Sequence, residues 1–283
     1  MQIALGRLLP SARNLIREDF LEFLATLARD LPDWWVCEQC VKLHRSRKFD
    51  NSKRIADSRC SRTPRSNSYY WMNSESRLCH QHVQLALKYA RMDNRKWAYQ
   101  KYLDAVLAPR HMTTGAKTPG LKYRASYYPK IVKGRFLILG VLRFEKNKNV
   151  VSADTIRHMT ICMHQYFCVS DLILLERLQA LNPQPPLNPT LALSTAIGAG
   201  LKNEGVEARG FCPQCPTDFS FRATPNRAAL CFWQDLGPEG SPLNLTWRVH
   251  VDNTSSADNP IIVCHKEPGS IRSLYESGFG KRV

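Results

Sequence analysis

YYPKIVKGRFLILGVLRFEKN, residues 127–147, indicates the fold class more clearly than any other stretch of the chain. β-Branched and aromatic residues alternate on both sides of Lys133-Gly134, a pattern typical of two strands joined by a tight turn. Gly140, inside the second strand, predicts a bulge or a close approach of another group to the backbone. The stretch therefore predicts a β-hairpin within a small antiparallel sheet.

Helical patterns lie on both sides of this hairpin. Upstream, residues 15–31 carry an amphipathic stripe that Pro32 ends, and a second helix is expected over about 79–107, with Trp97 among its buried residues. We expect the stripe to be buried along its whole length: Ile16, Phe20, Phe23, Leu24, Leu27 and Leu31.

Downstream, shorter elements follow the hairpin. Helices are expected over 152–160, 170–181 and 190–203, then short β-like runs that include LTWRVHV at 245–251, and a poorly ordered tail over 273–283. The predicted class is α+β, with N-terminal helices around a zinc-binding loop, followed by the sheet, its helices and a second zinc knuckle. We divide the chain into a helical, basic region, 1–120, and an α+β region, 121–283.

Composition limits the class of protein. The 283 residues are 43% hydrophobic and 23% charged, which excludes wholesale disorder, and no apolar run is long enough to cross a bilayer. The start of the chain lacks the features of a secretory signal, so we expect an intracellular protein, cytoplasmic or nuclear. Its ten cysteines should then be reduced, which favours metal ligation over disulfides.

FCPQCPTDFSF, residues 211–221, contains the clearer of two predicted metal sites. A Cys-x-x-Cys turn presents two thiolates at a separation that suits zinc, and the strand-like residues after it argue against a redox motif. Upstream, Cys162 and His164 are alternate residues that point to one side if their segment is extended. We predict a closed structural site of Cys162, His164, Cys212 and Cys215, with Cys168 as a substitute ligand.

A second site is predicted in the basic segment that begins CEQCVKLH, residues 37–44. Zinc held by Cys37, Cys40, Cys60 and Cys79 would order a polar loop that has no core of its own. Spacing leaves the fourth ligand open between Cys79 and three histidines: His44, His80 and His82. A flexible loop with incidental cysteines is the alternative.

Several stretches together resemble a family. In chain order they are REDFLEFLATLARDLPDWWVCEQCVKLH (17–44), HQHVQLALKYAR (80–91), IVKGRFLI (131–138), ICMHQ (161–165), CPQCPTDFSF (212–221) and TWRVHV (246–251). They resemble fungal proteins described as F-box domain-containing, in which an F-box precedes a helix, a Cys-x-x-Cys-x₃-His loop, a Cys-Pro-His and a Cys-x-x-Cys-x-Thr-Asp. Two departures are expected to matter: the F-box itself is missing, and Met163 replaces the proline.

Three functional hypotheses follow. The first is a non-enzymatic, zinc-stabilised protein-interaction module, a degenerate F-box-type substrate adaptor, whose protein partner is expected to be acidic because the chain is basic. The second is nucleic-acid binding, since residues 1–130 carry a net charge of +13 out of the total of +16. Its candidate residues are Arg45, Arg47, Lys48, Lys53 and Arg54. The third, an enzyme, is disfavoured because no catalytic motif is present, so no catalytic residue is predicted.

Overall fold

A computed structural model describes residues 10–46, 68–70, 77–93, 96–114, 122–145, 151–156, 158–181, 191–251 and 267–277. Helices and antiparallel strand pairs make up the described residues, which confirms the α+β class. The chain divides into two compact units. The first contains residues 1–107, 133–136 and 237–254, and the second contains 108–132, 137–236 and 255–283. None of the described helices has the length and apolar character needed to span a membrane.

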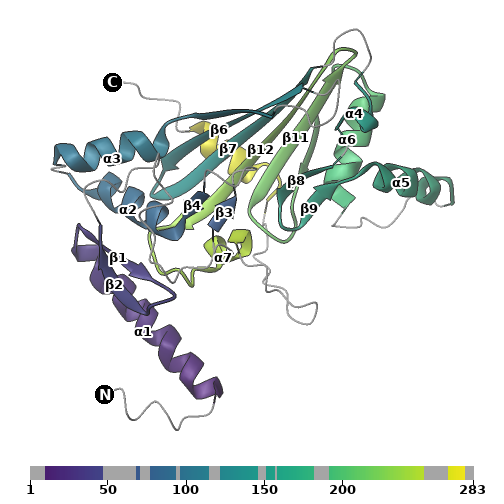
Figure 1. Ribbon diagram of the computed structural model, residues 1–283. Coiled ribbons are helices and arrows are strands. Elements are labelled where there is room, and N and C mark those ends of the chain that lie inside the picture. Colours follow the sequence, from purple (N-terminus) through teal and green to yellow (C-terminus); the bar gives the residue numbers. More distant parts are fainter. Residues whose placement is uncertain are drawn as a thin grey trace. The chain divides into compact units, whose positions relative to one another are not determined.

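In the first unit, the long helix α1 (Pro10–Asp30) packs on a hairpin of β1 (Trp34–Cys37) and β2 (Lys42–Arg45) (Figure 1). The small core between them consists of Leu21, Leu24, Ala28 and Val36. The prediction that the whole amphipathic stripe is buried is wrong, because the hairpin contacts a helix face rotated from it. Four of its residues are 43% to 59% exposed: Ile16, Phe20, Phe23 and Leu27.

The second predicted helix is interrupted. β3 (Ser68–Tyr70) pairs with β4 (Arg77–Cys79), which leads directly into α2 (His80–Arg91), and α3 (Trp97–Leu107) follows as a separate helix. The prediction of one helix over 79–107 is therefore wrong, because the backbone of Met92 turns to an extended conformation after α2. Trp97, which we expected to be buried, is 75% exposed.

Lys88 of α2 hydrogen-bonds to the segment that follows α1. Its Nζ donates to the carbonyl oxygens of Leu31 at 3.0 Å and Trp34 at 2.6 Å, although the residue is only 2% exposed. Burial lowers the pKa of Lys88 to about 8. These two hydrogen bonds tie α2 to the segment that links α1 to β1.

The prediction for the segment LTWRVHV is also wrong. It forms a short helix, α7 (Leu245–Val251), where we predicted a strand. Asn244 precedes it and acts as the N-cap, since its Oδ1 accepts the backbone N–H of Thr246 at 2.9 Å. The alternation of apolar residues in this segment was therefore misleading, and the capping asparagine was the better signal.

The second unit is built on one six-stranded sheet, in the order β10-β11-β12-β7-β6-β5 (Figure 1). Its strands are β5 (Arg110–Thr114), β6 (Lys122–Val132), β7 (Arg135–Glu145), β10 (Ala208–Phe211), β11 (Thr217–Thr224) and β12 (Arg227–Pro238). The predicted hairpin is confirmed as β6 and β7, and Lys133 and Gly134 have φ angles of 49° and 71°, as a type I′ turn requires. The close approach predicted at Gly140 is confirmed too, since a Cβ there would lie 2.1 Å from the Phe232 ring.

Helices and a small hairpin flank this sheet. α6 (Ala192–Lys202) packs on β10 and β11, and it confirms the helix predicted over 190–203, as α5 (Val169–Leu181) confirms the one over 170–181. The helix predicted over 152–160 is wrong, because α4 (Ala153–Ile156) stops early and β8 (Met159–Cys162) begins. β8 pairs with β9 (Gln165–Phe167).

The predicted disorder of the tail is wrong over residues 273–277. These belong to α8 (Ser270–Ser277), which contacts β6 and β11. Its first turn is held by Asp218 of β11, which is 2% exposed and accepts the backbone N–H groups of Gly269, Ile271 and Arg272 at 2.8–2.9 Å. A carboxylate at a helix N-terminus is favourable, and the sequence of the tail alone does not contain it.

Candidate metal centres

The β8–β9 hairpin positions the first pair of candidate ligands in the second unit. Cys162 is the last residue of β8 and lies opposite Gln165, so Met163 and His164 form a two-residue turn. The segment therefore turns at His164, whereas we expected it to be extended. The tight turn nevertheless brings the two side chains together, and Met163 points outward with 47% of its surface exposed.

The loop between β10 and β11 positions the second pair. Its turn is closed by the N–H of Cys212, which donates to the carbonyl of Thr217 at 2.8 Å, and by the N–H of Thr217, which donates to the carbonyl of Cys215 at 2.7 Å. Both cysteine side chains are fully buried. This is the knuckle geometry that the Cys-x-x-Cys spacing predicted.

The structure brings all four predicted residues together. The ligand atoms of Cys162, His164, Cys212 and Cys215 lie within 4.8 Å of one another. Nδ1 of His164 is buried and has no hydrogen-bond partner among the described residues. A tetrahedron with bonds of about 2.3 Å has ligand atoms roughly 3.8 Å apart, so this cluster could close around a metal ion with small movements.

The three thiols do not titrate alike. Burial raises the pKa of Cys162 and of Cys215, whereas hydrogen bonds from these two thiols lower the pKa of Cys212. The cluster therefore favours a thiolate at Cys212 that accepts hydrogen bonds from the thiols of Cys162 and Cys215. A bound cation would deprotonate the others as well, because it supplies the positive charge that the buried sulfurs lack.

A buried amide ties the two halves of this cluster to the sheet. Gln234 of β12 is fully buried, and its Nε2 donates to the carbonyl of Ile161 at 2.9 Å and to the hydroxyl of Thr217 at 3.3 Å. The Thr217 hydroxyl also lies 3.2 Å from the sulfur of Cys215. Neighbours that orient ligands in this way are typical of metal sites. We did not identify Gln234 from the sequence, which gives no signal for it.

The first unit contains a second cluster, on the β1–β2 hairpin. The ligand atoms of Cys37, Cys40 and His44 lie within 4.8 Å of one another. The His44 ring stacks on Trp35 with centroids 5.0 Å apart, and its Nε2 is buried without a hydrogen-bond partner in the described part of the chain. Burial and the charge of Lys42 lower the pKa of His44, which favours the neutral imidazole that metals bind.

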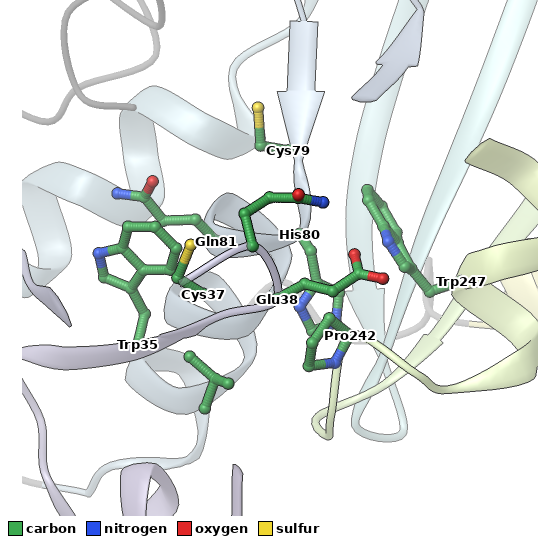
Figure 2. A pocket seen from close by; sticks show the side chains of 10 residues that line it. Trp35, Cys37, Glu38, Cys79, His80, Gln81, Pro242 and Trp247 are labelled. Carbon is green, nitrogen blue, oxygen red and sulfur yellow. The ribbon is translucent and has the colours of Figure 1, made fainter. Parts of the chain in front are cut away.

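Cys79, the fourth ligand that we preferred, lies outside this group of three. It shares the wall of a small pocket with Cys37, but its sulfur points away from Cys37 (Figure 2). Cys60 lies outside the described residues, so its part in the site stays a prediction. The hairpin instead places His44, one of the open alternatives, beside the two cysteines.

The remaining histidine alternatives have other contacts around the start of α2. Nδ1 of His82 accepts the backbone N–H of Cys79 at 3.0 Å, which caps the helix. Nδ1 of His80 lies 2.7 Å from the amide of Gln84, its ring packs on Trp247, and burial lowers its pKa to about 3. Both rings therefore serve packing and capping in this structure.

The remaining described cysteines have other surroundings or other contacts. Cys168, the substitute ligand, is not in the four-residue cluster, and its sulfur lies 2.9 Å from the hydroxyl of Ser170. No disulfide links any two of the cysteines that the structure describes. Both clusters therefore consist of reduced cysteines and a histidine, which could hold a metal ion.

Of the five predicted nucleic-acid residues, one lies among the described residues. Arg45 is exposed at the end of β2. The other four, Arg47, Lys48, Lys53 and Arg54, lie outside the described residues. Nucleic-acid binding through this loop stays a prediction.

Comparison of the chain with models of known families, with curated proteins and with solved structures finds no match.

Proposed function

We propose that this protein is a non-enzymatic, intracellular protein-interaction module stabilised by zinc. The observation that carries the proposal is the buried group of Cys162, His164, Cys212 and Cys215. Three thiols and one imidazole are a common donor set of structural zinc sites, and four protein ligands leave no open position for a substrate. Such a site contributes folding energy rather than catalysis.

We extend the zinc proposal to the β1–β2 hairpin. Cys37, Cys40 and His44 supply three ligands of the same kind, and Cys60 is the further ligand that we propose. The residue after Cys40, Val41, has a φ of 50°, a strained conformation for a β-branched side chain. Local strain of this kind is common where a loop is held in place by a ligand.

The exposed row on α1 is the surface that we propose for partner binding. Ile16, Phe20, Phe23 and Leu27 recur at spacings of four, three and four residues, so they form one continuous stripe on the helix. The rings of Phe20 and Phe23 stack with centroids 6.1 Å apart. Contiguous apolar surface of this kind, next to polar residues, is typical of interaction sites.

The charges beside the stripe indicate the chemistry of the partner. Asp19 and Asp30 occupy the next row of α1, on the side away from Leu21 and Leu24, and both are exposed. A partner with an apolar groove bordered by lysine or arginine would complement this surface. The acidic partner expected from net charge would need another surface, which includes the basic loop outside the described residues.

The resemblance to fungal F-box domain-containing proteins supports a more specific role for this module. We propose a degenerate substrate adaptor, in which the metal clusters hold the shape and α1 contacts the partner. This last step is supported by the resemblance and not by the geometry.

Site-specific crosslinking tests the interaction. A photo-crosslinking amino acid at position 23 is compared with the same group at position 97, where Trp97 is a large apolar residue that is also exposed, on α3. We expect one partner at position 23, crosslinked through an apolar peptide that is rich in lysine or arginine, and loss of that product with Phe20→Glu. Identical products at both positions, or none at position 23, would count against the proposal.

A further inference from the structure

The sheet of the second unit has a hollow on one face, close to the residues that α8 covers. α8 packs on this face through Tyr275, which forms an apolar cluster with Val132, Leu137 and Trp233. The hollow has a volume of about 350 Å³. Its walls include His111, Met112, Arg124, Ser126, Tyr128 and Arg143.

The turn of the β6–β7 hairpin determines which residues face each other across this hollow. Each strand has 11 residues, and a type I′ turn of two residues joins them. Val132 therefore lies opposite Arg135, and, counting outward from the turn, Arg124 lies opposite Arg143. Both arginines line the same hollow, as this register requires.

Two arginines in this position repel each other. Directly opposed residues on one face have Cβ atoms about 4.5–5.5 Å apart, and like charges at that distance are unfavourable. Both residues are exposed, and none of the ion pairs between described residues includes either of them. None of the described residues that line the hollow is a carboxylate. The described lining of the hollow therefore carries two positive charges that no ion pair between described residues neutralises.

Hydrogen-bonding groups lie beside the two guanidinium groups. Ser126 belongs to the same face of β6 as Arg124, and its hydroxyl lies 3.0 Å from Nδ1 of His111. The His111 ring in turn packs edge-on against Tyr128, with centroids 5.9 Å apart. These contacts hold the serine and the histidine in the wall of the hollow.

We propose that this hollow binds the phosphate group of a small phosphomonoester. A phosphomonoester carries close to two negative charges at neutral pH, which matches two arginines, and its oxygens accept the paired N–H groups of guanidinium. Two arginines directly opposite each other match one phosphate group better than a nucleic-acid backbone, which is bound by cations spaced along its length. This site is independent of the metal clusters and of the surface on α1.

Titration of the full chain with phosphate compounds tests the site. The probes are inorganic phosphate, adenosine 5′-monophosphate and dimethyl phosphate, a singly charged diester, with binding followed by calorimetry. We expect the first two to bind and the diester to bind at least about tenfold more weakly. Arg124→Gln and Arg143→Gln should each weaken phosphate binding by about tenfold or more.

Arg209→Gln is the matched control, because Arg209 is an exposed arginine of the same sheet whose guanidinium is paired with Glu207. It should bind phosphate as the unchanged protein does. A second measurement does not depend on the ligand's identity: without phosphate, Arg124→Gln should melt at the same temperature as the unchanged protein or higher, since it removes a repulsion. The same concentration of phosphate should then raise the melting temperature of the unchanged protein and of Arg209→Gln more than that of Arg124→Gln.

Three results would overturn the proposal. They are no binding of either phosphate probe at millimolar concentration, equal loss of binding in Arg209→Gln, and binding of a single-stranded oligonucleotide with no binding of the monoesters. The last result would assign the hollow to nucleic acid instead.

Discussion

Replacement of Asp218 by asparagine should release α8 from the sheet while the metal clusters stay intact. The carboxylate comes three residues after Cys215 and accepts three backbone N–H groups at the start of α8. Oδ1 accepts the N–H of Gly269, and Oδ2 accepts those of Ile271 and Arg272, all at 2.8–2.9 Å. An asparagine keeps one acceptor oxygen and turns an NH₂ group towards donors.

The magnitude follows from these contacts. Hydrogen bonds to a charged group are worth about 1.5–3 kcal/mol each, and a buried donor left without an acceptor costs about 1–3 kcal/mol. Asp218→Asn weakens at least one of the three bonds to that extent and removes the favourable charge at the helix N-terminus. We therefore expect the free energy of unfolding to fall by about 3 kcal/mol.

Urea unfolding and hydrogen exchange measure the effect. The midpoint should shift to lower urea, and the amides of Ile271 and Arg272 should exchange much faster than in the unchanged protein. Glu276→Gln is the control, because it removes only a half-exposed i,i+4 ion pair with Arg272 and should cost less than about 0.5 kcal/mol. A loss in Asp218→Asn as small as in the control, with both amides still protected, would refute this account of α8.

Two further predictions concern the core and the end of α1. Gly140→Ala should destabilise the second unit by about 3 kcal/mol, because the new methyl group overlaps the Phe232 ring, and Phe232→Leu should restore part of the loss. Equal unfolding midpoints with and without the methyl group would contradict the close approach. Lys88→Met should lower stability at pH 9 by about 1–3 kcal/mol, since the carbonyl of Trp34 loses the donor that Lys88 supplies and the carbonyl of Leu31 keeps only the N–H of Trp34. Because burial depresses the pKa of Lys88 to about 8 in the folded state, the charge on its ammonium group opposes folding at pH 7. This opposition fades as the pH rises from 8 towards the unfolded value near 10.5. The stability difference between the unchanged protein and Lys88→Met, measured by urea unfolding, should therefore grow from pH 8 to pH 10, and a difference that shrinks over this range would contradict the assignment.

Local signals in the sequence were sufficient for the hairpin and for the four-residue cluster. Lys133-Gly134 and the alternation around it specify a type I′ turn, since few other residues tolerate positive φ at both positions. Cys162, His164, Cys212 and Cys215 were found from ligand type and spacing. The turn at Met163 differs from the extended segment that we expected, yet it presents the same two side chains.

Features that depend on distant contacts could not be predicted in this way. The apolar stripe of α1 has helical spacing, but which of its rows is buried depends on the β1–β2 hairpin that packs against it. The order of α8 depends on Asp218, about fifty residues earlier in the chain, so the sequence of the tail alone does not predict a helix. Spacing in the sequence does not distinguish Cys79 from His44 as the fourth ligand, whereas the four-residue turn of β1–β2 brings His44 back to Cys37.

The zinc content of the purified protein tests the central claim most directly. We expect one tightly held zinc per chain from the four-residue cluster and a second where the Cys37 cluster is complete, measured by elemental analysis after dialysis against a weak chelator. Cys215→Ser should lose one equivalent, whereas Cys168→Ser, outside both clusters, should lose none. A chain that folds with no bound metal, or a Cys215→Ser variant that holds as much zinc as the unchanged protein, would contradict the account.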